Sequence, residues 1–119
     1  MSTFNRVCHI EFDVTDLARS QAFYSALFGW DFRAFMETMV IFGFGDDHIG
    51  GLMKVDQVQS GKSPSIWFQV ENLEAMQSAA AANGGRADVE ITPVPGVGNS
   101  TIVHDPDGNP VGLVQYDPC

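Results

Sequence analysis

Hydrophobic and polar residues alternate along residues 6–14, the first clear pattern in the chain. The apolar set on one face is Cys8, Ile10, Phe12 and Val14. The polar set on the opposite face is His9, Glu11 and Asp13. A period of two is typical of a strand with one buried face. The pattern therefore predicts a strand whose polar face carries three candidate functional side chains.

An amphipathic helix is predicted directly after this strand, because Thr15 or Asp16 can cap its start and Gly29 can end it. Its predicted apolar stripe is Leu17, Phe23, Tyr24, Leu27 and Phe28. Residues 39–44 and 49–55 are rich in strand formers and are separated by turn-forming residues. The first half of the chain is therefore expected to contain a strand, a helix and then two or three strands.

The second half of the chain repeats the first, from the strand through the helix to the helix end, with a constant offset of 56 positions. The residues Ile10, Phe12, Val14, Asp16, Leu17 and Gly29 correspond in order to Ile66, Phe68, Val70, Asn72, Leu73 and Gly85. The repeat predicts a strand over 65–70 and a helix over 73–82, which Asn72 can cap and Gly84 and Gly85 can end. Two copies of one supersecondary unit commonly leave a cleft, so the positions at which the copies differ are candidate site positions.

The rest of the second half contains predicted strands and turns. Val89 and Ile91 suggest a strand, residues 93–98 a bend, and residues 100–103 and 111–116 a strand pair. The turn between that pair is expected to use a positive φ at Gly108. If Gly51 matches Gly112, the offset has grown to 61, which fits a longer loop in the second copy.

Composition narrows the partners that the chain can have. Its 119 residues fit one domain, and 15 acidic residues against six scattered basic ones give a net charge of −9. No cationic patch is expected, so nucleic acid and anionic membranes are poor partners. Glu11 and Asp13 interrupt the apolar residues near the N-terminus, and no membrane-length apolar stretch occurs, so we expect a cytoplasmic protein. Cys8 and Cys119 are expected as thiols.

Three segments resemble the vicinal oxygen chelate superfamily, which includes lactoylglutathione lyase, bleomycin-resistance proteins and extradiol dioxygenases. The segments are HIEFDVTDLARSQAFYSALFGW at 9–30, VENLEAMQSAAAANGG at 70–85 and VHDPDGNPVGLVQY at 103–116. The resemblance implies an α+β fold in which two tandem βαβββ modules have mixed sheets that curl around a shared cavity. Residues 57–64 contain almost no apolar side chains and are therefore expected to be a linker between module one at 1–56 and module two at 65–119. The resemblance also implies a homodimer.

The resemblance further implies four metal-ligand positions, on the first and last strand of each module. They fall on His9, on or near Gly51, on Ser65 and on Gly112. Ser65 and the two glycines are unsuited to hold the divalent ion, and His9 alone makes a weak site. Glu11 and Asp13 share its face, but same-face residues stand about 6.5–7 Å apart along a strand. We therefore expect no bound cofactor, with Ni, Zn, Mn or Fe as the alternative and His9 as the candidate ligand.

A ligand site is expected where the two modules differ. Trp67 and Gln69 stand in the second copy where Glu11 and Asp13 stand in the first. An indole beside an amide suits a planar organic ligand, and an acidic wall suits a cation. Trp67 could equally be a core or interface residue, and His9 could simply line the cavity. Phe42 and Phe44 share a strand face and would both line it or neither would.

Two functions follow from these observations. The first is a protein that binds a small organic molecule between the modules without the complete metal site, through the ligand-binding set His9, Glu11, Asp13, Trp67, Gln69, Phe42 and Phe44. The alternative is a metal-dependent lyase or dioxygenase that acts on vicinal oxygens of a small substrate through His9 and non-standard ligands. His48 is expected in a turn, exposed and without a role.

Overall fold

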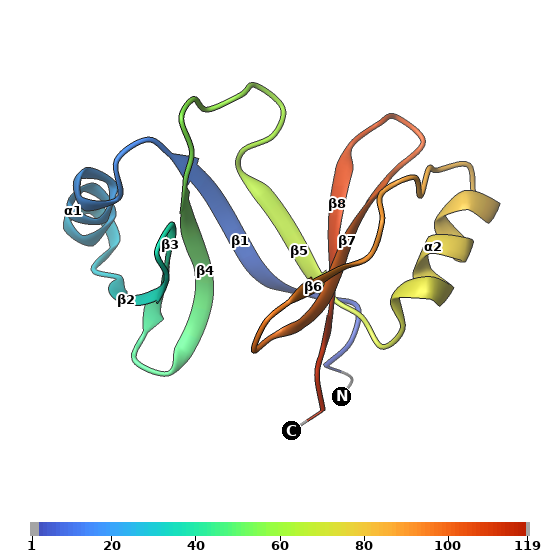
Figure 1. Ribbon diagram of the computed structural model, residues 1–119, viewed down its shortest axis with the longest axis horizontal. Helices are drawn as coiled ribbons and strands as arrows, with labels where there is room; N and C mark the ends of the chain where they lie inside the picture. Colours follow the sequence, from blue (N-terminus) through green and yellow to red (C-terminus); the bar gives the residue numbers. More distant parts are fainter. Residues whose placement is uncertain (1–2, 119) are drawn as a thin grey trace. The chain divides into compact units, whose positions relative to one another are not determined.

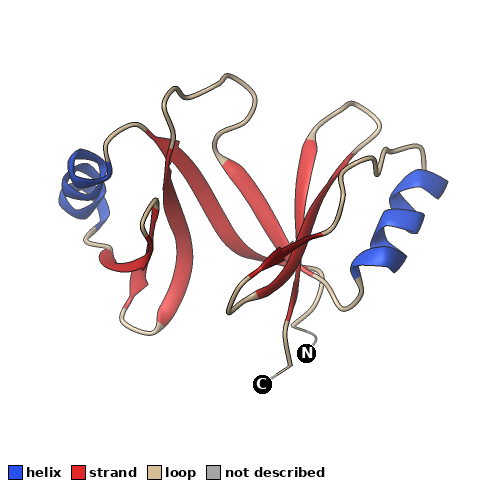
Figure 2. Ribbon diagram, viewed as in Figure 1, coloured by secondary structure: helices blue, strands red, loops and turns tan. Residues whose placement is uncertain are grey.

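The computed structural model describes residues 3–118 and divides them into two units (Figures 1 and 2). The N-terminal unit comprises residues 8–65. The C-terminal unit comprises the chain up to Val7 together with the chain from Ile66 onward. Each unit runs strand, helix, three strands, so the predicted α+β class with two βαβββ modules is confirmed.

The N-terminal unit contains a mixed sheet in the order β2-β3-β4-β1. Its elements are β1 (Arg6–Val14), α1 (Leu17–Phe28), β2 (Asp31–Met36), β3 (Met39–Phe44) and β4 (Asp47–Lys54). Strands β1 and β4 pair in parallel, whereas β3 pairs antiparallel with both β2 and β4. The core of this unit is built on Val14, Phe42 and Leu52. Because β1 and β4 are neighbours, side chains of both strands can meet on the face opposite this core.

The C-terminal unit has the same plan, with strand order β5-β8-β7-β6. Its elements are β5 (Ser65–Gln69), α2 (Leu73–Ala82), β6 (Thr92–Val94), β7 (Gly98–His104) and β8 (Pro110–Tyr116). Strands β5 and β8 pair in parallel, as β1 and β4 do. The core is built on Val70, Leu73, Val103 and Leu113.

The helix ends follow the predicted capping chemistry. The side chain of Asp16 accepts a hydrogen bond from the Arg19 backbone N–H at 3.0 Å, and Asn72 does the same for Ala75 at 2.9 Å. These bonds satisfy backbone donors that have no partner within a helix. Helix α1 ends at Gly29 with a φ of 72°, a conformation that favours glycine.

The predicted strand at Val89 and Ile91 is wrong, because β6 begins only at Thr92 and extends into the predicted bend of residues 93–98. The Val89 carbonyl instead accepts hydrogen bonds from Gln77 Nε2 at 3.1 Å and from Thr101 Oγ1 at 2.8 Å. Ile91 packs against the core from this irregular segment. Hydrogen bonds from these two side chains therefore satisfy the Val89 carbonyl, which a neighbouring strand would otherwise have to do.

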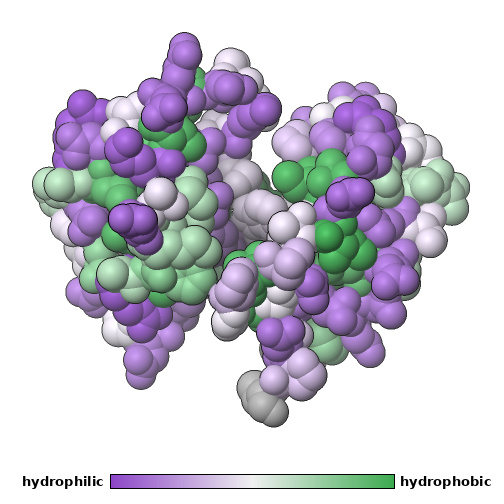
Figure 3. Space-filling view, in the orientation of Figure 1, coloured by the Kyte–Doolittle hydropathy of each residue, from purple (hydrophilic) through white to green (hydrophobic). Residues whose placement is uncertain are grey.

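The predicted apolar stripe of α1 is only partly used for packing. Leu17 and Tyr24 pack against the core, whereas Phe23 and Leu27 are each 58% exposed. Positions 17 and 24 project in nearly the same direction at 3.6 residues per turn, and positions 23 and 27 project to one side. Hydrophobic side chains therefore reach the surface of this unit, as the green areas in Figure 3 show.

Two further observations bear on the sequence-based expectations. Cys8 is a thiol rather than half of a disulfide, and Cys119 lies outside the described residues. Within residues 3–118, no helix is long and apolar enough to cross a membrane.

Candidate functional site

Three polar side chains of the N-terminal unit form a continuous chain of contacts. His9 Nε2 lies 3.2 Å from Glu11 Oε1, and His9 Nδ1 lies 2.8 Å from His48 Nε2. The side chains of His9 and Glu11 are only 17% and 19% exposed. Both nitrogens of His9 are therefore engaged, one by a carboxylate and the other by a second imidazole.

The two imidazole rings meet end to end. Their planes differ by 14° and their centroids are 5.1 Å apart. That separation is close to the N···N distance plus the two ring radii, and it is too long for rings stacked face to face. The nearly coplanar arrangement aims the lone pair of one nitrogen at the proton of the other, which is the geometry of a hydrogen bond.

An irregularity in the β3–β4 pairing brings His48 to this site. Phe42 pairs with Gly50, but Gly43 pairs with His48, so Ile49 is an extra residue on β4. The extra residue reverses the alternation of side chains along the strand. Ile49 consequently packs towards the core, and His48 lies on the same face as His9.

This arrangement corrects one expectation. His48 is exposed as predicted, but it lies in β4 and not in a turn. The flexible side chains of His9 and Glu11 bring their terminal atoms to 3.2 Å, although the two residues are separated along the strand. Sequence reasoning missed His48 as a site residue because no sequence signal marked the bulge.

The charges around His48 favour its neutral form. Although the residue is exposed, partial burial of the ring lowers the pKa of His48, and His9 and Arg33 lower it further. Asp47 acts in the opposite direction. A neutral imidazole retains one nitrogen lone pair, so His48 can act as a hydrogen-bond acceptor or a base.

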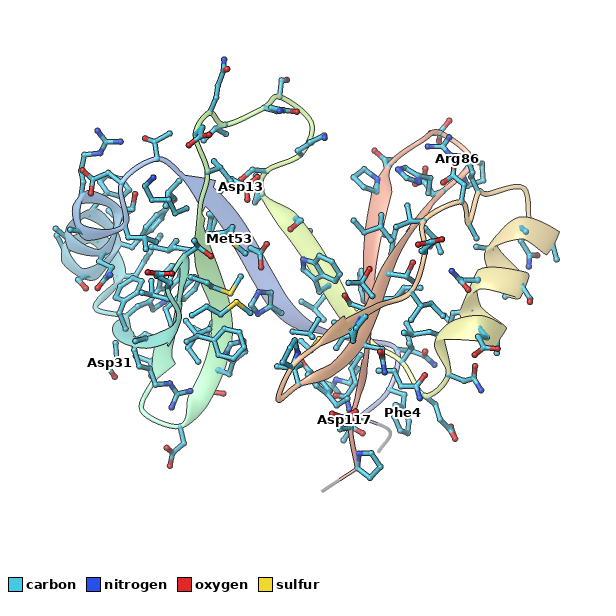
Figure 4. All side chains as sticks on the ribbon, in the orientation of Figure 1. Phe4, Asp13, Asp31, Met53, Arg86 and Asp117 are labelled. Atoms are coloured by element: carbon cyan, nitrogen blue, oxygen red, sulfur yellow. The ribbon has the colours of Figure 1, made fainter. Side chains whose placement is uncertain are left out.

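Asp13, the third polar residue of the β1 face, belongs to a different part of this unit. Figure 4 places it at the end of β1 near the loop of residues 55–64. Its backbone N–H donates to Ser63 Oγ at 2.9 Å, and burial followed by the nearby Glu11 charge raises the pKa of its carboxyl group, against an opposing effect of Lys62. Asp13 borders a polar hollow of about 410 Å³, whose other lining residues are Val55, Asp56, Gln57, Gln59 and Lys62.

The strand register settles which residues stand at the implied metal positions of the two last strands. Glu11 pairs with Gly51 in the N-terminal unit, and Trp67 pairs with Gly112 in the C-terminal unit. Since Glu11 and Trp67 are 56 positions apart, Gly51 and Gly112 are equivalent. A Cβ at Gly51 would lie 3.3 Å from His9 Cε1, so this position faces His9.

Trp67 fills the space at the equivalent position of the C-terminal unit. A Cβ at Gly112 would overlap Cδ2 and Cε3 of the indole, so the ring lies directly against the glycine backbone. A glycine is needed here because any side chain would displace the ring. No side chain at position 112 could reach a metal ion while Trp67 holds this place.

The donor set does not fit the divalent ion that the superfamily resemblance implies. Of the four implied positions only His9 carries an imidazole, and its two nitrogens contact Glu11 and His48. Across residues 3–118, no group of three or more His, Cys, Asp or Glu side chains is arranged to hold a metal ion. A stable site normally needs at least three protein ligands, so we assign no step to a metal.

The remaining predicted ligand-binding residues lie in contrasting environments. Phe42 is 2% exposed and stacks on Trp30 with a centroid distance of 4.2 Å, so it is a core residue. Phe44 is about half exposed at the end of β3. Gln69 is partly buried at the end of β5, where its backbone carbonyl accepts from the Asn5 N–H. A ligand-binding role for Phe44 or Gln69 stays a prediction.

This fold and these residues define a member of a known superfamily. Residues 6–113 match the model of the Glyoxalase/Bleomycin resistance protein/Dioxygenase superfamily. Because the match spans most of the chain, the chain belongs to this superfamily. The resemblance seen in the sequence is thereby confirmed.

Individual relatives carry several different names. A glyoxylase-like domain-containing protein of Didymella fabae is 29% identical over an alignment 121 positions long, which covers 92% of each chain. A variant of homoprotocatechuate 2,3-dioxygenase from Brevibacterium fuscum has a TM-score of 0.68 at 25% identity. That match covers 97% of this chain but only 33% of the dioxygenase. Methylmalonyl-CoA epimerase from Mycobacterium tuberculosis has a TM-score of 0.71 at 17% identity, with coverage of 99% and 92%, and shares the fold alone.

Proposed function

We propose that this chain binds a small organic molecule on the sheet face that carries Trp67, without the four-position metal site. The observation that supports this proposal is the indole of Trp67 lying against Gly112. The ring takes the place of a potential metal ligand and offers an aromatic surface instead. Because Gly112 has no side chain, the indole packs directly against the strand backbone, and this contact restricts movement of the ring.

The chemistry of this face favours a planar ligand. An indole ring stacks on aromatic or conjugated groups and contributes about 0.5–1.5 kcal/mol beyond the area it buries. Gln69 follows on the same face of β5 by strand alternation and can supply a hydrogen bond that orients the ligand. Trp67 is only partly buried, so some of the residue's surface remains available for such a contact.

Tryptophan fluorescence offers a direct test. Trp30 is the second tryptophan, so a Trp30→Phe background leaves Trp67 as the reporter. A panel of planar aromatic compounds would be titrated against this variant, and any hit measured by calorimetry in wild type, Trp67→Ala and Trp30→Phe. We expect Trp67→Ala to raise the Kd at least about tenfold, a loss of about 1.4 kcal/mol, and Trp30→Phe to leave it unchanged.

Two results would contradict this proposal. One is a panel in which no compound quenches or shifts the Trp67 emission. The other is a hit whose Kd is the same in wild type and Trp67→Ala, since such a ligand would not depend on the indole.

A metal-dependent lyase or dioxygenase is the second candidate. It is favoured by the likeness to homoprotocatechuate 2,3-dioxygenase at 25% identity. Elemental analysis of the chain purified without chelator, in wild type and His9→Ala, separates the two candidates. Stoichiometric Ni, Zn, Mn or Fe that disappears in His9→Ala supports the enzyme, whereas a metal-free wild type supports the binding protein.

A further inference from the structure

We propose that Glu11, His9 and His48 form a proton relay in which His48 Nδ1 is a general base. Glu11 and His9 are positioning residues, because they act on the substrate only through His48. The proposal rests on the two contacts of His9, at 3.2 Å to Glu11 and 2.8 Å to His48. It uses the N-terminal unit alone, so it is independent of ligand binding at Trp67.

The carboxylate fixes the direction of the relay. An ionised carboxylate can only accept hydrogen bonds, so His9 donates from Nε2 to Glu11. A neutral His9 then has its lone pair on Nδ1, which accepts the Nε2 proton of His48. His48 in turn has its lone pair on Nδ1. One ionised side chain thus sets the tautomers of two imidazoles, as in hydrolytic triads where a carboxylate orients a histidine.

Proton transfer along this chain balances in two steps. The substrate's bond to hydrogen breaks, and the proton forms a new N–H bond at Nδ1 of His48. The Nε2 proton of His48 then moves to Nδ1 of His9, so His48 is neutral again and His9 carries the positive charge beside the Glu11 carboxylate. The electron pair of the broken bond stays with the substrate.

The surroundings support this direction of charge movement. Glu11 contacts His9 directly, and Asp13 lies close enough for the Glu11 charge to affect it. A positive charge that arrives on His9 therefore lies next to the Glu11 carboxylate.

The site is also accessible. His48 is exposed, whereas His9 and Glu11 are mostly covered, so a small molecule reaches the outer end of the relay first. Gly51 places no side chain beside His9, where even a Cβ would lie 3.3 Å from the ring. The imidazole can therefore keep the coplanar alignment with His48 that proton transfer requires.

A nitro-substituted benzisoxazole is a suitable probe, because one proton abstraction opens its ring. The base removes the ring C–H proton, the C–H electrons form a nitrile, and the N–O bond breaks to a coloured phenolate. General-base catalysis is typically worth about 10²–10⁴-fold. We expect His48→Gln to lower the ring-opening rate at least about tenfold, and Glu11→Gln to lower it by a smaller factor. His104→Gln, in the C-terminal unit, should leave the rate at the wild-type level.

Nitrogen NMR distinguishes the relay from a structural contact. We expect Nδ1 of His48 to resonate as an unprotonated nitrogen in wild type. In Glu11→Gln it should shift towards the protonated value, because the neutral amide no longer enforces one tautomer. The proposal is wrong if wild type gives no rate above buffer, if His48→Gln keeps the wild-type rate, or if Glu11→Gln leaves the His48 resonance unchanged.

Discussion

Replacement of Gly112 by alanine tests the close contact on which the Trp67 site depends. The added Cβ would overlap Cδ2 and Cε3 of the indole, and no small adjustment relieves two overlaps with a rigid ring. Trp67 must move away or β8 must shift. Overpacking of this kind costs about 1–3 kcal/mol, which corresponds to about 3–6 °C in Tm per kcal/mol for a chain of this size.

Gly51→Ala is the matched control, because Gly51 holds the equivalent position in the N-terminal unit. Its Cβ would lie 3.2 Å from the Val40 carbonyl oxygen and 3.3 Å from His9 Cε1, contacts that tenths of an ångström relieve. Replacing glycine by alanine also restricts the unfolded chain, which contributes about 0.4–1 kcal/mol of stability. We therefore expect a net change close to zero, measured by urea unfolding.

A double-mutant cycle decides whether the indole causes the cost at position 112. In a Trp67→Ala background the ring is absent, so Gly112→Ala should be nearly neutral, and the coupling between the two positions should exceed about 0.5 kcal/mol. If Gly112→Ala costs the same with and without Trp67, or costs no more than Gly51→Ala, then the indole does not require the glycine and our account of this strand is wrong.

Three further predictions concern the rest of the chain. Asp16→Ala removes the N-cap of α1 and should destabilise the protein by about 1 kcal/mol in urea unfolding; an unchanged midpoint would mean that the cap contributes nothing. Hydrogen bonds from Asn109 hold the pKa of Asp105 below its ordinary 3.8, so the stabilisation from this carboxylate is present above that pH and is lost as the pH falls through the lowered pKa. Wild type should therefore exceed Asp105→Asn in stability at pH 7 and converge with it in acid, and a gap that persists in acid would contradict this sign. Sedimentation tests the homodimer that the superfamily resemblance implies, with twice the chain mass of 12.9 kDa as the expected value and a single-chain mass as the refuting one.

The sequence alone determined most of the order of elements and much of their local chemistry, but it left two or three strands open after the first helix and misplaced β6. The strand over 6–14, the Asn72 cap, the Gly29 helix end and the positive φ at Gly108 all follow from residue type and spacing. The cap of α1 was narrowed to Thr15 or Asp16, and the structure selects Asp16. These features depend on neighbours within a few positions, so a single chain read in order contains the necessary information. The equivalence of Gly51 and Gly112 was also correct, and the strand register confirmed it.

Only the tertiary structure determined which side chains meet. One extra residue at Ile49 reversed the side-chain alternation of β4 and turned His48 towards His9, 39 positions earlier in the chain. Strand periodicity predicts a face only while pairing is regular, and a bulge arises from the fit of two strands to each other. The contact of Trp67 with Gly112 likewise depends on the β5–β8 pairing. A glycine in the sequence does not show which neighbouring side chain occupies the space beside it.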